Sequence, residues 1–186
     1  MRRRLTLFTI LATLLTTTSA IAQKAALKSN LLYDATTTIN LGVEFAFNDT
    51  YTLDLSGNYN GWKFGGGKQW CHWLIQPEAR YWFDTKFDGH FVGVHAHVAG
   101  FNVAGLKMFG TKDVRHQGHL GGAGITYGYN WRLNDRWHLE AAVGVGYAYI
   151  DYEKWPCADC GKKLSDHTKH YFGPTKAALS LIYIFK

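Results

Sequence analysis

Apolar and polar residues alternate one by one along much of this chain. The alternation is clearest from Tyr51 to Asn60, where odd positions are mostly apolar or aromatic and even positions are polar. A β-strand points successive side chains to opposite faces, so this segment has one apolar face and one polar face. The pattern therefore predicts a β-strand rather than a helix.

Seven further segments alternate in the same way, which brings the predicted strands to eight. They are a weaker stretch at 25–33 and clearer ones at 39–47, 72–83, 92–99, 122–133, 137–147 and 176–185. The pattern leaves open whether residues 25–47 form one strand or two. Short turns are expected at 48–49, 84–89 and 134–135, and longer loops at 65–69, 105–116 and 155–169. Short turns at one end, longer loops at the other and an even number of strands are typical of outer-membrane barrels.

The predicted fold is therefore all-β: an eight-stranded antiparallel up-and-down transmembrane β-barrel. Aromatic side chains of the apolar faces gather near the short-turn end, as expected for an interfacial girdle. They are Phe45, Phe47, Tyr51, Tyr81, Phe83, Trp131, Trp137, Tyr183 and Phe185. We expect these apolar faces to contact outer-membrane lipid.

The polar faces carry full charges, four of each sign, and we expect them to form an ion-paired network in the lumen. Its members are Lys28, Arg80, Arg132 and Lys176 against Glu44, Asp54, Glu78 and Glu140. Many of the 20 glycines fall on the same faces and suit a narrow interior. Eight strands leave a lumen that side chains just fill, which argues against a narrow channel for small solutes.

The first 22 residues have the features of a cleavable signal peptide. Three arginines precede an apolar run, and Ala20 and Ala22 supply the small residues of a cleavage site after Ala22. Residues 23–186 then form one barrel domain, exported to the bacterial outer membrane. Removing the three arginines lowers the formal charge from +6 to +3. Without a basic cluster, nucleic acid is not an expected partner.

Several strings resemble an uncharacterised family of small outer-membrane β-barrels from Bacteroidota. The matching segments are 28–44, 53–60 with Trp62, 76–82, 93–97 and 128–131. Members of that family are often encoded near fimbrial assembly genes, and some carry an added peptidoglycan-binding domain. The resemblance implies an outer-membrane location and a fimbria-related role. It implies no catalytic residues.

The last long loop carries a set of residues that suits a metal. Cys157 and Cys160, followed by His167 and His170, offer the sulfur and nitrogen ligands that zinc prefers, although the pairs are closer than in common zinc fingers. A local Cys157–Cys160 disulfide is the favoured alternative in an exported protein. Cys71 remains, so at least one of the three thiols has no partner within the chain.

Two more groups of residues are candidates for a metal site or a catalytic site. His95 and His97 lie on one strand face and point into the lumen, where the choice is between a metal pair and two neutral or paired histidines, the second being favoured. His90, His116 and His119 are expected to be exposed. Ser165, Asp166 and His167 share a loop, but adjacent residues seldom form a working triad.

The sequence thus predicts a non-enzymatic outer-membrane barrel without catalytic residues or cofactor. It would act as a surface anchor or scaffold, with outer-membrane lipid around it and a fimbrial or other surface protein as partner. The alternatives are a lipid-modifying barrel enzyme and a narrow channel for small solutes.

Overall fold

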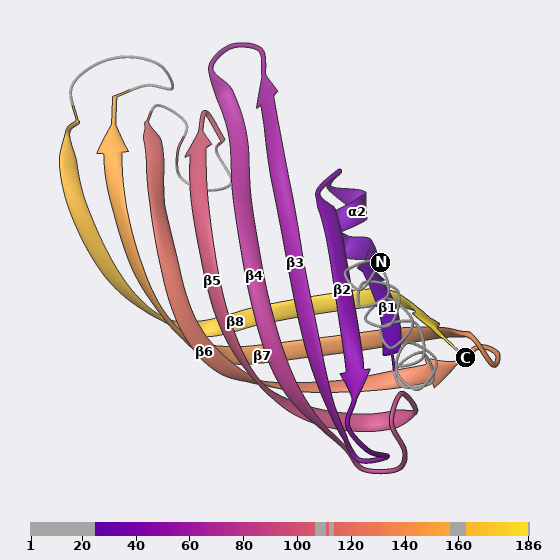
Figure 1. Cartoon of the computed structure of the whole chain (residues 1–186). Coiled ribbons are helices and arrows are strands. Elements are labelled where there is room, and N and C mark those ends of the chain that lie inside the picture. The colour runs from indigo at the N-terminus through magenta and orange to yellow at the C-terminus, as the bar shows by residue number, and fades with distance from the viewer. Residues whose placement is uncertain (1–24, 107–110, 112–113, 157–162, 186) are drawn as a thin grey trace, which may run out of the picture.

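The computed structural model describes residues 25–106, 111, 114–156 and 163–185, and within them eight strands and one short helix. The elements are β1 (Ala25–Asn30), α2 (Leu31–Ala35), β2 (Ile39–Ala46), β3 (Tyr51–Phe64), β4 (Lys68–Trp82), β5 (Gly89–Ala104), β6 (Arg115–Arg132), β7 (Trp137–Trp155) and β8 (Ser165–Ile184). Each strand pairs antiparallel with the next, and β8 pairs with β1, which closes the barrel (Figure 1). The predicted all-β fold with eight antiparallel strands is confirmed. The expected signal peptide lies outside the described residues.

The segment 25–47 forms two strands, β1 and β2, with the helix α2 between them. The Asn30 side chain accepts a hydrogen bond from the Leu32 N–H and so caps this five-residue helix. The sequence pattern extended the first strand to Tyr33 and did not predict the helix. In the described part of the chain, no helix is long and apolar enough to cross a membrane.

The later strands are longer than the sequence predicted, and the loops are correspondingly shorter. β6, β7 and β8 have 18, 19 and 20 residues, whereas β1 and β2 have 6 and 8. The loop expected at 65–69 is a tight turn, because Gly66 and Gly67 adopt positive φ values of 75° and 71° that favour glycine. Apolar–polar alternation fades in the outer parts of β6 to β8, so periodicity underestimates their length.

The strands are staggered around the ring. Register partners can be followed from Ala26 on β1 strand by strand to Gly173 on β8, yet the ladder between β1 and β8 pairs Ala26 with Ile184, eleven residues further along. Thr175, an extra residue in a β-bulge of β8, accounts for one of these eleven residues, and the other ten are the shear of the barrel, which tilts strands by about 35–45° from the axis.

An aromatic cluster fills the barrel at the short-turn end. Trp82 and Phe91 are fully buried with ring centroids 4.8 Å apart, and Phe87 of the β4–β5 turn packs against Trp82. The Phe87 carbonyl lies 2.7 Å from His138 Nδ1, which fixes the turn beneath the barrel. Alanines and Ile182 complete this plug.

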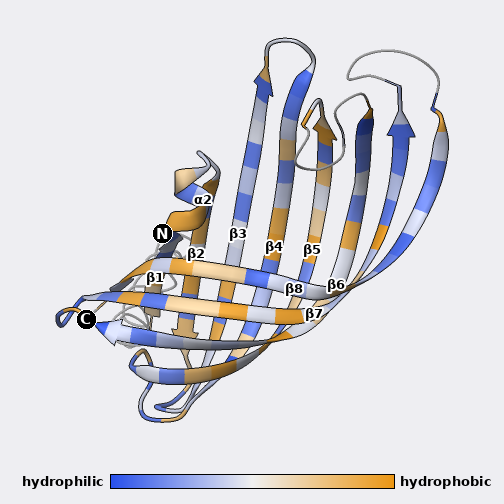
Figure 2. Ribbon diagram, turned by 180° about the vertical axis from the view of Figure 1, so that it is seen from behind, coloured by the Kyte–Doolittle hydropathy of each residue, from blue (hydrophilic) through white to orange (hydrophobic). Residues whose placement is uncertain are grey.

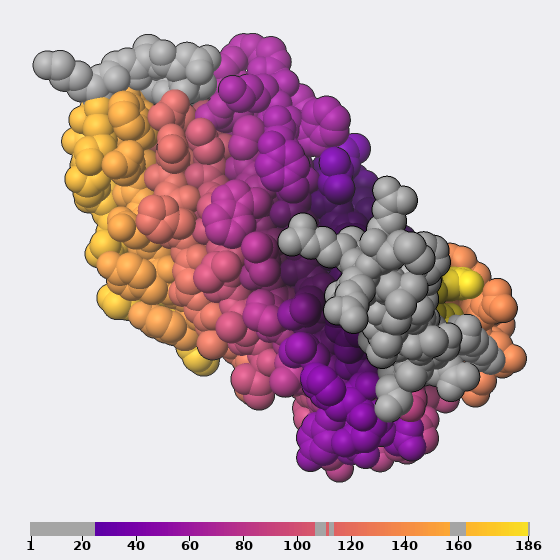
Figure 3. Space-filling model, viewed as in Figure 1, coloured from indigo at the N-terminus to yellow at the C-terminus, as the bar shows by residue number. Residues whose placement is uncertain are grey.

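Large apolar side chains cover the outer face of the barrel. Several are more than 60% exposed, although isoleucine and valine are among the residues most often buried in proteins: Ile39, Val94, Ile125 and Val143. Figure 2 shows hydrophobic segments along the lower parts of the strands and mostly hydrophilic ones where β7 and β8 approach their loop. The space-filling view shows side chains covering this wall continuously (Figure 3). Beyond the aromatic plug the interior is therefore largely polar, and the outer surface is largely apolar.

Candidate functional site

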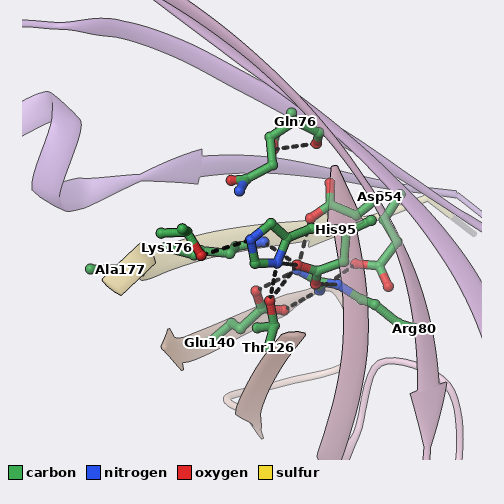
Figure 4. A network of polar contacts seen from close by, with 12 residues as sticks. Asp54, Gln76, Arg80, His95, Thr126, Glu140, Lys176 and Ala177 are labelled. Atoms are coloured by element: carbon green, nitrogen blue, oxygen red, sulfur yellow. Dashed lines mark hydrogen bonds and ion pairs between the residues drawn. The ribbon is translucent and has the colours of Figure 1, made fainter. Parts of the chain in front are cut away.

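Arg80 lies at the centre of a buried ionic network, next to the aromatic plug on the side of the long loops. Its guanidinium donates to four carboxylates: Glu78 at 2.6 Å, Glu44 at 3.0 Å, Asp54 at 2.8 Å and Glu140 at 2.8 Å. Its side chain is fully buried, and its charge also lies 4.4 Å from the centre of the Phe91 ring. Figure 4 shows Arg80, Asp54 and Glu140 converging in the interior.

Two lysines complete the network. Lys28 of β1 contacts Glu44 and donates to Glu140 at 2.9 Å, and Lys176 of β8 donates to Glu78 at 2.8 Å. Three cationic side chains thus face four carboxylates, all nearly inaccessible to water. Breaking one partner of such a buried set typically costs about 3–5 kcal/mol, because the remaining charges lose their compensation.

The strand register explains why the acids lie side by side. Glu44, Asp54 and Glu78 are successive partners across β2, β3 and β4, and His95 of β5 continues the row. Their positions share the inward face of the alternation. Carboxylates so close repel each other, and the central guanidinium offsets this repulsion.

His95 is held by two threonines. Thr126 donates its hydroxyl proton to Glu78, so the oxygen of Thr126 accepts from His95 Nδ1 at 2.9 Å. The other ring nitrogen, Nε2, lies 2.9 Å from the Thr175 hydroxyl and accepts from it. Both nitrogens are used, which favours the paired histidine over a metal ligand. His97 stacks beside His95 with centroids 5.6 Å apart.

The structure brings together seven of the eight residues expected in the lumen network, but not Arg132. Arg132 lies at the last position of β6, where its half-exposed side chain pairs with Asp135 of the following turn at 3.1 Å. Its polar-face parity suggested the lumen, but Arg132 lies at the end of the strand, beyond the enclosed interior. Three further partners were not predicted, because their side chains are short and uncharged: Thr52, which donates to Glu44, Thr126 and Thr175.

The predicted Cys/His site is only partly within the described residues, since Cys157 and Cys160 lie outside them. His167 and His170 lie on opposite faces of β8, because they are three positions apart in the strand. His167 Nε2 lies 2.8 Å from Ser165 Oγ, and His170 Nδ1 lies 2.6 Å from the Tyr147 hydroxyl. Among the described residues, no group of three or more His, Cys, Asp and Glu side chains is placed to hold a metal. The metal site and the disulfide both stay predictions.

Ser165 and His167 are within the distance of a nucleophile and its base. Asp166 does not orient the histidine, since it points to the outer face and pairs with Lys163 at 2.7 Å. Hydrogen bonds to Asp166 and Glu153 raise the pKa of this exposed lysine. The adjacent trio is therefore not a triad. A lipid-modifying activity stays an untested alternative.

His116 corrects a further expectation. It was expected to be exposed, but it lies on the inner face of β6 against Tyr152, with ring centroids 5.1 Å apart, and its Nε2 atom is buried. The free thiol of Cys71 lies near the outer end of β4, 3.8 Å from the Trp62 carbonyl.

The fold and the network define a class: a closed eight-stranded antiparallel barrel with an ionic interior and an apolar outer wall. The sequence pattern of one family, described as "Protein of unknown function (DUF3575)", matches residues 6–185. The chain belongs to this family, which covers nearly its whole length. No curated protein matches it.

Proposed function

We propose that the chain is an outer-membrane β-barrel that anchors in lipid and presents its long-loop end to a partner outside the membrane. The observation that supports this proposal best is that charged side chains lie inside the barrel and large apolar side chains lie outside, the reverse of a water-soluble protein. A water-soluble barrel of this composition would bury the apolar set. An arrangement with charged side chains inside and apolar side chains outside is favourable when hydrocarbon surrounds the barrel.

The upper limit of the apolar band supports this proposal. On the outer face, Asp151 of β7 is the register partner of both His119 on β6 and Thr168 on β8. Two residues higher, Glu153 likewise pairs with Gln117 and Asp166. Three neighbouring strands thus become polar at one level, as expected where strands leave the membrane.

The height of the band also fits a bilayer. Every outward residue of β7 from Trp137 to Tyr147 is apolar or aromatic. These ten residue steps extend roughly 33 Å along the strand, which a tilt of about 40° reduces to roughly 25 Å, the height of the apolar band in outer-membrane barrels. Trp137 at one end, and Tyr147 with Tyr149 at the other, then mark the two interfaces.

The closed short-turn end favours an anchor over a channel. Trp82, Phe87 and Phe91 close the short-turn end, and the Arg80 network lies directly above them. The long-loop end then offers the surface for a partner. The fimbrial link that the resemblance implies stays a prediction.

Fractionation tests the proposal. The full-length chain, expressed in a bacterium with an outer membrane, should sediment with that membrane and resist extraction by alkaline carbonate. Unboiled, it should migrate faster in sodium dodecyl sulfate gels than after boiling, as closed barrels do. Recovery of folded chain from the soluble fraction without detergent would refute the proposal.

A further inference from the structure

An apolar cavity lies inside the barrel, on the long-loop side of the ionic network. It has a volume of about 400 Å³, within the range of ligand-binding cavities. Leu74, Ala99, Leu120 and Ile150 are register partners on β4 to β7 and form one apolar row of its wall. The network and the plug close it from the short-turn end.

Toward the long loops the wall gains polar side chains beside the apolar Phe101 and Val103. His72 and His116 line the cavity above the apolar row, and their Nδ1 and Nε2 atoms, respectively, are buried without a hydrogen-bond partner among the described residues. Lys154, the register partner of His116, is close enough for its charge to act on that imidazole. An occupant with an apolar tail and an anionic head would match this order.

The barrel wall is low on one side of the cavity. β8 pairs with β1 only over Ser180–Ile184, and β2 pairs with β3 only as far up as Ile39 and Tyr59. Among the described residues, no strand therefore lies between the upper parts of β3 and β8. Figure 1 shows β1, α2 and β2 ending well below the tops of the other strands. At this edge the outer surface is still apolar, since Ile39 is 69% exposed and Leu32 of α2 is 46% exposed.

The edge of β8 at this opening is unsuited to a partner strand. Pro174 lacks an N–H, and Thr175 forms a β-bulge, and both features prevent strand addition. A flexible hydrocarbon chain needs no backbone partner, so it fits the opening better than a peptide.

We propose that the cavity binds a single acyl chain of an amphiphile with an anionic head, admitted sideways over α2 from the outer leaflet. The inference rests on the proposed membrane location. The chain lies against the Leu74 row, and the head lies near His72, His116 and Lys154. A free fatty acid and a membrane phospholipid share this chemistry.

Photolabelling of the full chain in lipid nanodiscs tests the proposal. The anionic probes are palmitic acid and a phosphatidylglycerol, each with a diazirine on its acyl chain. A phosphatidylcholine with the same acyl chains is the probe without net charge. Labelled residues are located by peptide mass spectrometry. Ala99→Phe fills the inner wall, and Ala96→Phe places the same ring on the outer face of β5 as the matched control.

We expect labels on the inner residues Leu74, Phe101 and Ile150, at least tenfold weaker in A99F and unchanged in A96F. The stronger of the two anionic probes identifies the source. Labels on outer residues such as Val143 without inner labels would overturn the cavity proposal and leave the membrane location standing. Absence of labels on both faces would refute the membrane location itself. Equal inner labelling by phosphatidylcholine would refute the anionic head.

Discussion

Thr175 and Lys176 are consecutive residues, yet both side chains point into the barrel. Thr175 contacts His95 and Lys176 donates to Glu78, each in the buried network. A β-bulge makes this possible, because Gly144 pairs with Lys176 while Val145 pairs with Pro174, which leaves Thr175 as an extra residue. Below the bulge the outward positions of β8 are odd, and above it they are even.

Deleting Thr175 should prevent folding, because the whole upper half of β8 would turn its faces over. Phe172, now 81% exposed on the outer face, would enter the interior. Thr175→Ala keeps the bulge and loses one hydrogen bond, at a cost of about 1 kcal/mol. Urea unfolding in lipid vesicles measures both variants, and equal stability of the two would contradict this role of the bulge.

Arg80→Met should destabilise the barrel by about 3–5 kcal/mol, since four carboxylates would then face only two lysines. Arg132→Met is the matched control, because Arg132 is half-exposed and its pair with Asp135 contributes about 0–1 kcal/mol. The urea concentration at the midpoint of unfolding reports the stability of both variants. A similar, small effect of the two substitutions would show that the network contributes little.

Gly124→Ala should destabilise the barrel, whereas Gly121→Ala on the opposite face should not. A Cβ at Gly124 would lie 2.5 Å from the Val145 carbonyl oxygen and 2.8 Å from the His95 ring, and such overpacking costs about 1–3 kcal/mol. A Cβ at Gly121 meets nothing closer than 3.8 Å. Thermal unfolding of the two variants compares them, and a stable G124A variant would contradict the close packing of the interior.

Much of this fold could be predicted from alternation alone. The inward parity of Glu44, Asp54 and Glu78 already placed their charges on one face, and antiparallel register then brought them side by side. The face of each of these residues is a local property, set by its position in the strand. That is why seven of the eight predicted network residues meet in the interior.

Other features depend on contacts that sequence periodicity does not encode. Arg132 is on the polar face of its strand but lies beyond the enclosed part. Its position along the strand therefore decides its partner, and its face does not. The bulge at Thr175 reverses the parity of the outward positions of β8, and the ladder to β7 reveals the residue at which the reversal occurs. Helix α2 is set by the local Asn30 cap, and at five residues it is too short for a helical period to appear.

Val143→Arg should weaken the barrel in vesicles by about 2–4 kcal/mol, as arginine does on a lipid face near the bilayer centre. Thr168→Arg, on the outer face of β8 above the apolar band, should change stability little. The measurement is urea unfolding in vesicles. Similar stabilities of the two variants would place Val143 in water.

Spin-label accessibility along β7 tests the central claim most directly. Single cysteines from 139 to 153, in a variant whose native cysteines are serine, are labelled in vesicles and compared for access to oxygen and to a water-soluble nickel complex. We predict that odd positions up to Tyr149 favour oxygen, that preference switches to nickel at Asp151, and that even positions such as Ala142 admit neither. Nickel access at odd positions along the whole strand would contradict a lipid-facing outer wall.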